Sequence, residues 1–429
     1  MFKRQEHPIA GSTTLGHLIL IALLAFIPAA FAADPPKAPV PKSPYIAVVY
    51  RYADTLLEKG RDNSGSFFSA IDRTTLTALT NNAASGSINP QRNENLLRLL
   101  YFLTELTTKA KYREAADRCL RNFLLEAGAL PASGPTWNER RSWTLWDRCF
   151  ALEPEISHRL TLDLKKLGNG TNDTGRRAGF CIRAWATAIA RTGDGKFTNA
   201  IFEQAISIPS SLGAGLTNFD AASAVSLAID CDGAAHLVSS SLAQDLRRLA
   251  SSLDGIFCGL PHDLSKARGF FVKLTEKSER PEFIVTPQWI AGNSELTTAQ
   301  VGMMCVSRYD NSARSDYLRL LVAAADSYHD SFPSDDTDVP PRTFGHVISL
   351  QVAAWRHTAK PIYLEQARKF GDWAIEKFFG TNALPRASLK REHYESGTGA
   401  DTLALGLAEL HLQVLHITAV RCPPNTIDR

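Results

Sequence analysis

Residues 342–379 read RTFGHVISLQVAAWRHTAKPIYLEQARKFGDWAIEKFF, and this stretch determines the fold that we expect. Apolar side chains recur at helical spacing in its first half, from Val347 to Ala354, and again in its second half, from Tyr363 to Ala374. A polar turn ending at Pro361 separates the halves, and proline suits the first turn of a helix. The stretch is therefore predicted to be a hairpin of two helices.

The same pattern occurs three more times, in NENLLRLLYFLTELTTKAKYREAADRCL, RAGFCIRAWATAIARTGDGKFTNAIFEQA and TAQVGMMCVSRYDNSARSDYLRLLVAAADSY. In each copy an aromatic residue follows the turn; the four are Tyr112, Phe197, Tyr317 and Tyr363. Counting back 18 residues from the tyrosines and 19 from Phe197 reaches four expected helix starts, Glu94, Ala178, Ala299 and Gly345. Hairpins that cannot bury their apolar faces alone must stack or close into a ring. We therefore predict an all-α fold, an (α/α) toroid of about six helical hairpins with little β structure.

The N-terminus has the pattern of a secretory signal peptide. Lys3 and Arg4 precede an apolar run, Leu18 to Phe31, which ends in a small-x-small cleavage site at Ala32. We expect residues 1–32 to be removed, although an uncleaved anchor is the alternative. Residues 33–44 form a proline-rich lead-in and residues 45–429 a single toroid domain, so we expect an exported protein with no membrane attachment after cleavage.

Composition excludes some classes of partner. Of the 429 residues 44% are hydrophobic and 21% are charged, as in an ordinary globular protein, and the formal charge of +3 gives no support for nucleic-acid binding. Four residues, Cys231, His236, Cys258 and His262, could together hold a divalent cation. Their spacing matches no strong zinc motif, so a Cys231–Cys258 disulfide and ordinary packing stay open as alternatives, and no cofactor is required.

Several segments resemble a group of exported bacterial proteins common in planctomycetes, among them YADTLLEKGRD, SLAIDCDGAAH, TFGHVISLQVAAWRHTA and the closing GADTLALGLAELHLQVLHITAVRCPPNTIDR. That group looks similar to the six-hairpin toroid superfamily, which holds glycoside hydrolases and polysaccharide lyases, including pectate-lyase-like proteins. The resemblance implies a carbohydrate-active enzyme with a polysaccharide or oligosaccharide partner. It carries over no catalytic residue.

The candidate site comes from the repeat register, because the inner helices of a toroid begin at one rim. β-Elimination on a uronate needs a cation for the carboxylate, a base and an acid, whereas hydrolysis needs two carboxyl groups. We predict that His346 or His393 supplies the base and Tyr394 the acid, all facing one cleft. The predicted substrate-binding residues are Asn93, Glu94, Trp146, Arg176, Arg177, Trp289, Gln300, Arg391 and Asp401.

The alternatives for these residues are structural ones. Asn93 and Asp401 would serve equally as helix caps, and the two arginines as partners of nearby acids. His346 and the tryptophans could instead be core residues. A polysaccharide lyase acting on a uronate-containing polymer is the first functional hypothesis. A glycoside hydrolase is the second, and a non-catalytic glycan-binding or scaffold protein is the third.

Overall fold

The structure is a computed structural model that describes residues 43–79, 93–129, 145–167, 174–212, 221–265, 269–275, 282–290 and 296–425. The chain divides into two units, Met1–Val40 and Pro41–Arg429, and the fold described below is that of the second. The predicted signal peptide therefore lies outside the described residues. Within the described ranges, no helix combines the length and the apolarity needed to span a bilayer.

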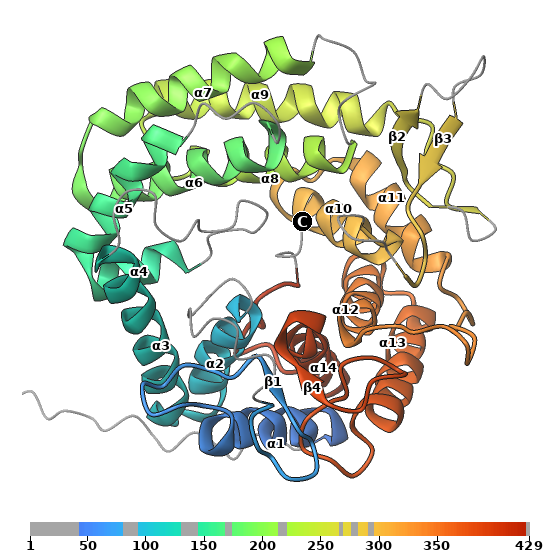
Figure 1. Cartoon of the computed structure of the whole chain (residues 1–429). Helices are drawn as coiled ribbons and strands as arrows, with labels where there is room; N and C mark the ends of the chain where they lie inside the picture. The colour runs from blue at the N-terminus through green and yellow to red at the C-terminus, as the bar shows by residue number, and fades with distance from the viewer. Residues whose placement is uncertain are drawn as a thin grey trace, which may run out of the picture. The chain divides into compact units, whose positions relative to one another are not determined.

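The second unit is a ring built of an inner and an outer layer of helices (Figure 1). The inner helices are α2 (Glu94–Thr107), α4 (Trp146–Leu152), α6 (Thr174–Thr192), α8 (Ala221–Ala235), α10 (Thr298–Ser312), α12 (Pro341–Thr358) and α14 (Ala400–Val414). The outer helices are α1 (Pro44–Lys59), α3 (Ala110–Ala129), α5 (Pro154–Leu167), α7 (Lys196–Leu212), α9 (Ser240–Cys258), α11 (Ser315–Asp326) and α13 (Pro361–Ala374). The π-helical turn Ile375–Phe379 (η4) continues α13, and the 3₁₀ turn Ser396–Thr398 (η5) precedes α14.

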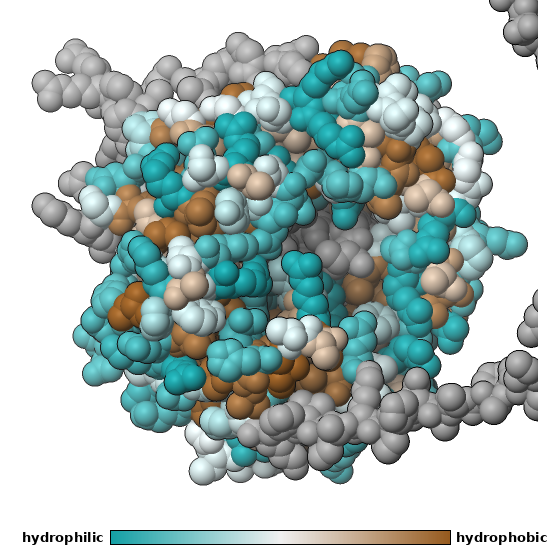
Figure 2. Space-filling view, turned by 180° about the vertical axis from the view of Figure 1, so that it is seen from behind, coloured by the Kyte–Doolittle hydropathy of each residue, from teal (hydrophilic) through white to brown (hydrophobic). Residues whose placement is uncertain are grey.

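The toroid prediction is confirmed. Each inner helix from α2 to α12 packs against the outer helix that follows it in sequence, and α14 packs against α1, which closes the ring. The described residues therefore form seven helix pairs, against the predicted number of about six. Seen from behind, the ring is mostly hydrophilic and is hollowed at its centre (Figure 2).

The aromatic residues that revealed the repeat are buried, and three of them connect neighbouring hairpins. Each tyrosine stands near the start of an outer helix, and its hydroxyl donates to a carboxylate on the preceding outer helix. The pairs are Tyr112 with Asp54 (2.8 Å), Tyr317 with Asp254 (2.6 Å) and Tyr363 with Asp326 (2.9 Å). Phe197, which has no hydroxyl, packs edge-on against the ring of His158 instead.

Two glycines let α12 and α14 approach closely. A Cβ on Gly345 would lie 2.4 Å from the carbonyl oxygen of Thr402, and a Cβ on Gly406 would lie 2.7 Å from the carbonyl oxygen of Gly345. Any side chain at these positions would force the helices apart. The two glycines therefore fix the spacing of the inner wall at this point.

The β-strands in the described residues form two short antiparallel pairs, beside a few isolated bridges. Strand β1 (Ala70–Ile71) pairs with β4 (Tyr394–Glu395), and β2 (Phe271–Thr275) pairs with β3 (Glu282–Val285). The first pair links two loops that are far apart in the sequence. It joins the loop before α14 to the loop after α1 and so positions residues 391–395.

Candidate functional site

The starts of α2 and α14 meet at the predicted rim, where they hold each other in place. The carboxylate of Asp401 accepts a hydrogen bond from the backbone N–H of Leu96 (3.0 Å), so a residue of one inner helix caps its neighbour. The amide of Asn95 donates to the hydroxyl of Thr402 at 2.8 Å. The structure thus brings two predicted residues, Glu94 and Asp401, to adjoining helix starts.

These residues are buried rather than solvent-facing. Glu94 is 2% exposed, Asn93 is 7% exposed and Asp401 is 6% exposed. The contacts of Asp401 fit the capping alternative, because its two carboxylate oxygens accept from the N–H groups of Leu96 and Thr402. Asn93 precedes α2 but makes no capping hydrogen bond through its side chain.

Tyr394 was predicted to face a cleft, and this expectation is wrong. Its side chain points from β4 into the core, where its hydroxyl lies 3.5 Å from that of Tyr52 on α1. Burial raises the pKa of Tyr394, and the nearby negative charge of Asp401 adds to this effect. A phenol enclosed in this way has no access to a polysaccharide.

His346 was also predicted to face solvent, and it is 1% exposed. Helix α12 begins at Pro341, four residues before the expected start at Gly345, so His346 falls in the second turn. That turn is enclosed because α12 packs against α10, α11, α13 and α14. His346 is therefore a core histidine, as its structural alternative supposed.

The accessible part of the predicted site lies in the loop before α14. One carboxylate oxygen of Glu395 lies 3.1 Å from a guanidinium nitrogen of Arg391 and 3.5 Å from Nε2 of His393. The side chains of Arg391, His393 and Glu395 are 47%, 31% and 34% exposed. A cation, an imidazole and a carboxylate therefore meet at the surface. Glu395 was not among the predicted site residues, although its place two residues after His393 on a strand was a usable signal.

Three further predicted residues, Arg176, Arg177 and Gln300, belong to the inner helices α6 and α10. Arg176 and Arg177 lie in the first turn of α6, and their side chains are outside the described part of the chain. Gln300 completes a capping box, because its side-chain oxygen accepts from the backbone N–H of Thr297 (2.8 Å) while Thr297 caps α10.

Both tryptophans pack in the core, as their structural alternative supposed. Trp146 is 2% exposed and donates from its indole nitrogen to the hydroxyl of Thr161. Trp289 is 9% exposed and stacks on Phe344, with a ring-centroid distance of 5.2 Å. Neither offers an open face on which a sugar ring could stack.

The four residues considered for a cation do not form a ligand set. Nε2 of His262 donates to the carbonyl oxygen of Phe257 (2.8 Å), and its Nδ1 accepts from the N–H of Phe271 (3.2 Å). Burial lowers the pKa of His262. In the described residues, no group of three or more His, Cys, Asp or Glu side chains could hold a metal ion. Cys231 and Cys258 are both free thiols.

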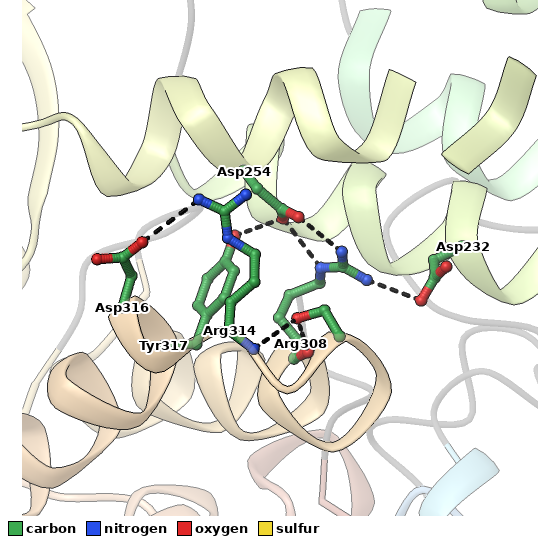
Figure 3. A network of polar contacts seen from close by, with 7 residues as sticks. Asp232, Asp254, Arg308, Arg314, Asp316 and Tyr317 are labelled. Carbon is green, nitrogen blue, oxygen red and sulfur yellow. Dashed lines mark hydrogen bonds and ion pairs between the residues drawn. The ribbon is translucent and has the colours of Figure 1, made fainter. Parts of the chain in front are cut away.

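A buried ionic network lies between α8, α9, α10 and α11 (Figure 3). The guanidinium of Arg308 donates twice to the carboxylate of Asp254, at 3.0 and 2.7 Å, and once to Asp232 at 2.9 Å. Tyr317 donates to the same carboxylate of Asp254. The side chains of Arg308 and Asp254 are 3% and 2% exposed, so this network ties helices together rather than facing a ligand. Single polar residues on four separate helices gave no sequence signal for it.

Comparison with known proteins gives the fold but no family. No family model matches the chain, and no curated protein matches it in sequence. Among solved structures, an inactive variant of an α-1,6-mannanase of Salegentibacter sp. HEL1_6 with bound α-1,6-mannotetrose has a TM-score of 0.50 and 9% identity, covering 86% of this chain and 100% of that one. A D-mannose isomerase gives 0.51 and 10%, covering 88% and 100%, and an unsaturated glucuronyl hydrolase specific for heparin gives 0.50 and 9%, covering 88% and 99%.

These likenesses show an (α/α) toroid, because identity this low carries the architecture and not the chemistry.

Proposed function

We propose that the chain is a carbohydrate-active enzyme, and that it is a polysaccharide lyase acting on a uronate-containing polymer. The fold likenesses support the broader part, because the three proteins compared above are a mannanase, a sugar isomerase and a glucuronyl hydrolase. The assignment as a lyase rests on one observation, that the partly exposed side chains of Arg391 and His393 both contact the carboxylate of Glu395. We further propose that the protein is exported, as its N-terminal sequence indicates.

The three side chains match the needs of β-elimination. The guanidinium of Arg391 has five N–H donors, so it can hold a substrate carboxylate while it keeps its contact with Glu395. The neutral imidazole of His393 takes the proton beside that carboxylate. The imidazolium that forms is stabilised by the negative charge of Glu395. The protonated His393 can then return a proton to the leaving oxygen, a role that the buried Tyr394 cannot fill.

Hydrolysis is the second candidate, because the same loop carries two carboxylates with some exposure, Glu392 and Glu395. Glu392 is less available than its 71% exposed side chain suggests, because it forms ion pairs with Arg73 at 2.8 Å and with Arg386 at 2.9 Å. A glycosidase needs a second carboxyl group that is free to act as acid or base, whereas the carboxylate of Glu392 is held by two arginines. This arrangement favours the lyase over the hydrolase.

A panel of polysaccharides tests the proposal. A lyase creates an unsaturated product that absorbs ultraviolet light, a hydrolase creates only new reducing ends, and a binding protein creates neither. We expect ultraviolet absorbance with uronate-containing polymers. Reducing ends without absorbance would refute the lyase, and binding without turnover would refute the enzyme.

Variants then test the residues. His393→Ala should lower kcat/KM at least 100-fold, which corresponds to about 3 kcal/mol of transition-state stabilisation. The urea midpoint should stay unchanged, because the side chain is partly exposed. His329→Ala is the matched control, since His329 is also an exposed histidine beside a carboxylate, that of Asp330. Full activity in His393→Ala would remove this residue from the mechanism.

A further inference from the structure

The chain turns back at the end of α14 and runs along the inside of the ring. The turn includes His416, whose φ is 51°, and Ile417, whose N–H donates to the carbonyl oxygen of Leu412 (2.8 Å). Further on, Cys422 contacts the carbonyl oxygen of Leu405, and Asn425 contacts that of Thr402. As the chain advances from Ile417 to Asn425, its partners on α14 lie progressively nearer the start of that helix. The segment Thr418–Asn425, here named the internal strap, therefore runs antiparallel to α14.

Helical geometry shows which side of α14 the internal strap covers. At 100° per residue, Thr402, Leu405 and Glu409 share one side of the helix, and His411 lies on the opposite side. His411 contacts Ser43 beside the outer helix α1 (2.9 Å). The side that carries Thr402 and Leu405 therefore faces the interior, and the internal strap lies on the inner side of the ring (Figure 1).

Two buried side chains, Cys422 and Asn425, make hydrogen bonds from the internal strap to the ring. The Nδ2 of Asn425 donates to the carbonyl oxygen of Thr402 (2.9 Å), the hydroxyl of Ser349 (3.1 Å) and the carbonyl oxygen of Gly345 (3.5 Å), so it lies at the seam between α12 and α14. Cys422 is 7% exposed and Asn425 is 1% exposed. They are three residues apart, which is one turn of a polyproline helix.

The residues that flank Cys422 within the internal strap are typical of a segment that can detach from the ring. Pro423 and Pro424 have no N–H to donate, and they hold the backbone extended whether or not it is docked. Pro424 and Arg421 are exposed. Because the ring closes through α14 and α1, detachment of the internal strap leaves every helix pair intact.

The surface under the internal strap is rich in hydrogen-bond acceptors. The carbonyl oxygens of Gly345, Thr402 and Leu405 and the hydroxyl of Ser349 receive the Asn425 amide and the Cys422 thiol. Each of these helical carbonyl oxygens can accept a second hydrogen bond beside its helical one, which suits a ligand with many hydroxyl donors. We propose that the internal strap is a releasable, autoinhibitory cover on a glycan-binding face formed by α12 and α14. The glycan part rests on the proposed function, whereas the release does not.

Cys422 is a built-in reporter of release. Burial raises the pKa of its thiol, so the docked form reacts slowly with alkylating reagents. Five other cysteines are buried in the ring and report its unfolding: Cys119, Cys149, Cys181, Cys231 and Cys305. Cys258, which is partly exposed, is replaced by serine in all variants.

Iodoacetamide labelling in increasing urea, read by mass spectrometry, tests the release. We expect Cys422 to be modified before the five ring cysteines, at a rate that hardly changes with low urea. Asn425→Asp removes the amide donor and places a charge beside carbonyl oxygens, so it should speed Cys422 labelling at least tenfold. Asn122→Asp is the matched control, because the Asn122 amide donates to Ser64 on the outside of the ring, and it should change nothing.

Labelling of Cys422 that rises with urea as steeply as labelling of the ring cysteines would overturn the release. That comparison uses the unaltered strap, so it decides the matter even if Asn425→Asp fails to fold.

Calorimetry with α-1,6-mannotetrose and with tetragalacturonate tests the covered face. We expect Asn425→Asp to bind at least one of these probes ten times more tightly than the unaltered chain. If Asn425→Asp and the unaltered chain bind each probe equally tightly, or if neither protein binds either probe, the glycan-binding part of the proposal is overturned. The labelling result still stands in that case. If Asn425→Asp binds a probe more tightly but no polysaccharide of the panel is turned over, the proposed enzymatic function is rejected. The proposal that the internal strap covers a glycan-binding face is then retained.

Discussion

Replacing Asp254 by asparagine should destabilise the ring more than any exchange of an exposed carboxylate. The side chain keeps its shape but loses the charge that accepts two hydrogen bonds from Arg308 and one from Tyr317. Arg308 is then a buried cation whose remaining partner is Asp232. Removing one partner of a buried ion pair costs about 3 to 5 kcal/mol.

The structure offers a matched control with the same chemistry at the surface. Arg191 donates to both carboxylate oxygens of Asp147, as Arg308 does to Asp254, but the two side chains are 45% and 60% exposed. Asp147→Asn should therefore cost about 1 kcal/mol or less. The slope m of the unfolding free energy against urea concentration is about 3 kcal/mol/M for a large domain, so the urea midpoint should fall by about 1 to 1.7 M for Asp254→Asn and by about 0.3 M or less for Asp147→Asn.

Urea unfolding followed by circular dichroism measures both shifts of the midpoint. The m values of the two variants and of the unaltered chain should be equal if the unfolding transitions are alike. The reasoning is refuted if the two variants lose the same free energy. Tyr317→Phe checks the assignment further. The Tyr317 hydroxyl is held less strongly once the charge of Asp254 is gone, so the double variant should lose less than the sum of the single losses.

Three further variants follow from burial and close contact. Burial lowers the pKa of His411 to about 4, so the unfolded chain, whose histidine titrates near 6.5, takes up the proton first as the pH falls. Stability from this residue is thus lost between about pH 6.5 and 4, and His411→Gln should lose about 2 to 3 kcal/mol less than the unaltered chain over that range in urea titrations. Tyr363→Phe removes the hydrogen bond to Asp326 and should cost about 1 kcal/mol at constant pH, and an unchanged urea midpoint would show the bond to be neutral. Gly345→Ala places a methyl group against the backbone of Thr402 and should cost about 1 to 3 kcal/mol, whereas a stabilised variant would contradict the close packing.

The repeat was predictable because one physical need recurs in four of the seven hairpins that the described residues form. An aromatic side chain after the turn fills the gap between two outer helices, and its distance from the observed start of the inner helix varies from 18 residues for α2 to 23 residues for α6. The carboxylates that receive Tyr112, Tyr317 and Tyr363 were not predictable, because each belongs to the preceding hairpin and stands at no constant sequence distance.

The candidate site was only partly predictable, for a reason that His346 illustrates. The register gives the order of residues along a helix, but not how deeply neighbouring helices enclose each turn. Pro341 begins α12 and carries His346 below the rim, between helices that the sequence cannot place. Arg391 and His393 lie in a loop that the pairing of β1 with β4 fixes just before α14, and there the position in the chain did indicate exposure.

The pairing of α1 with α14 sets the order in which the protein can mature. Ser43 and His411 touch although 368 residues separate them in the chain. On the ribosome the apolar side of α1 is made long before its partner α14. During most of synthesis that side has no native neighbour, and long-range closure of this kind is slow. Chaperones that hold exposed apolar helices should therefore associate with nascent chains that lack α14 and leave once it emerges.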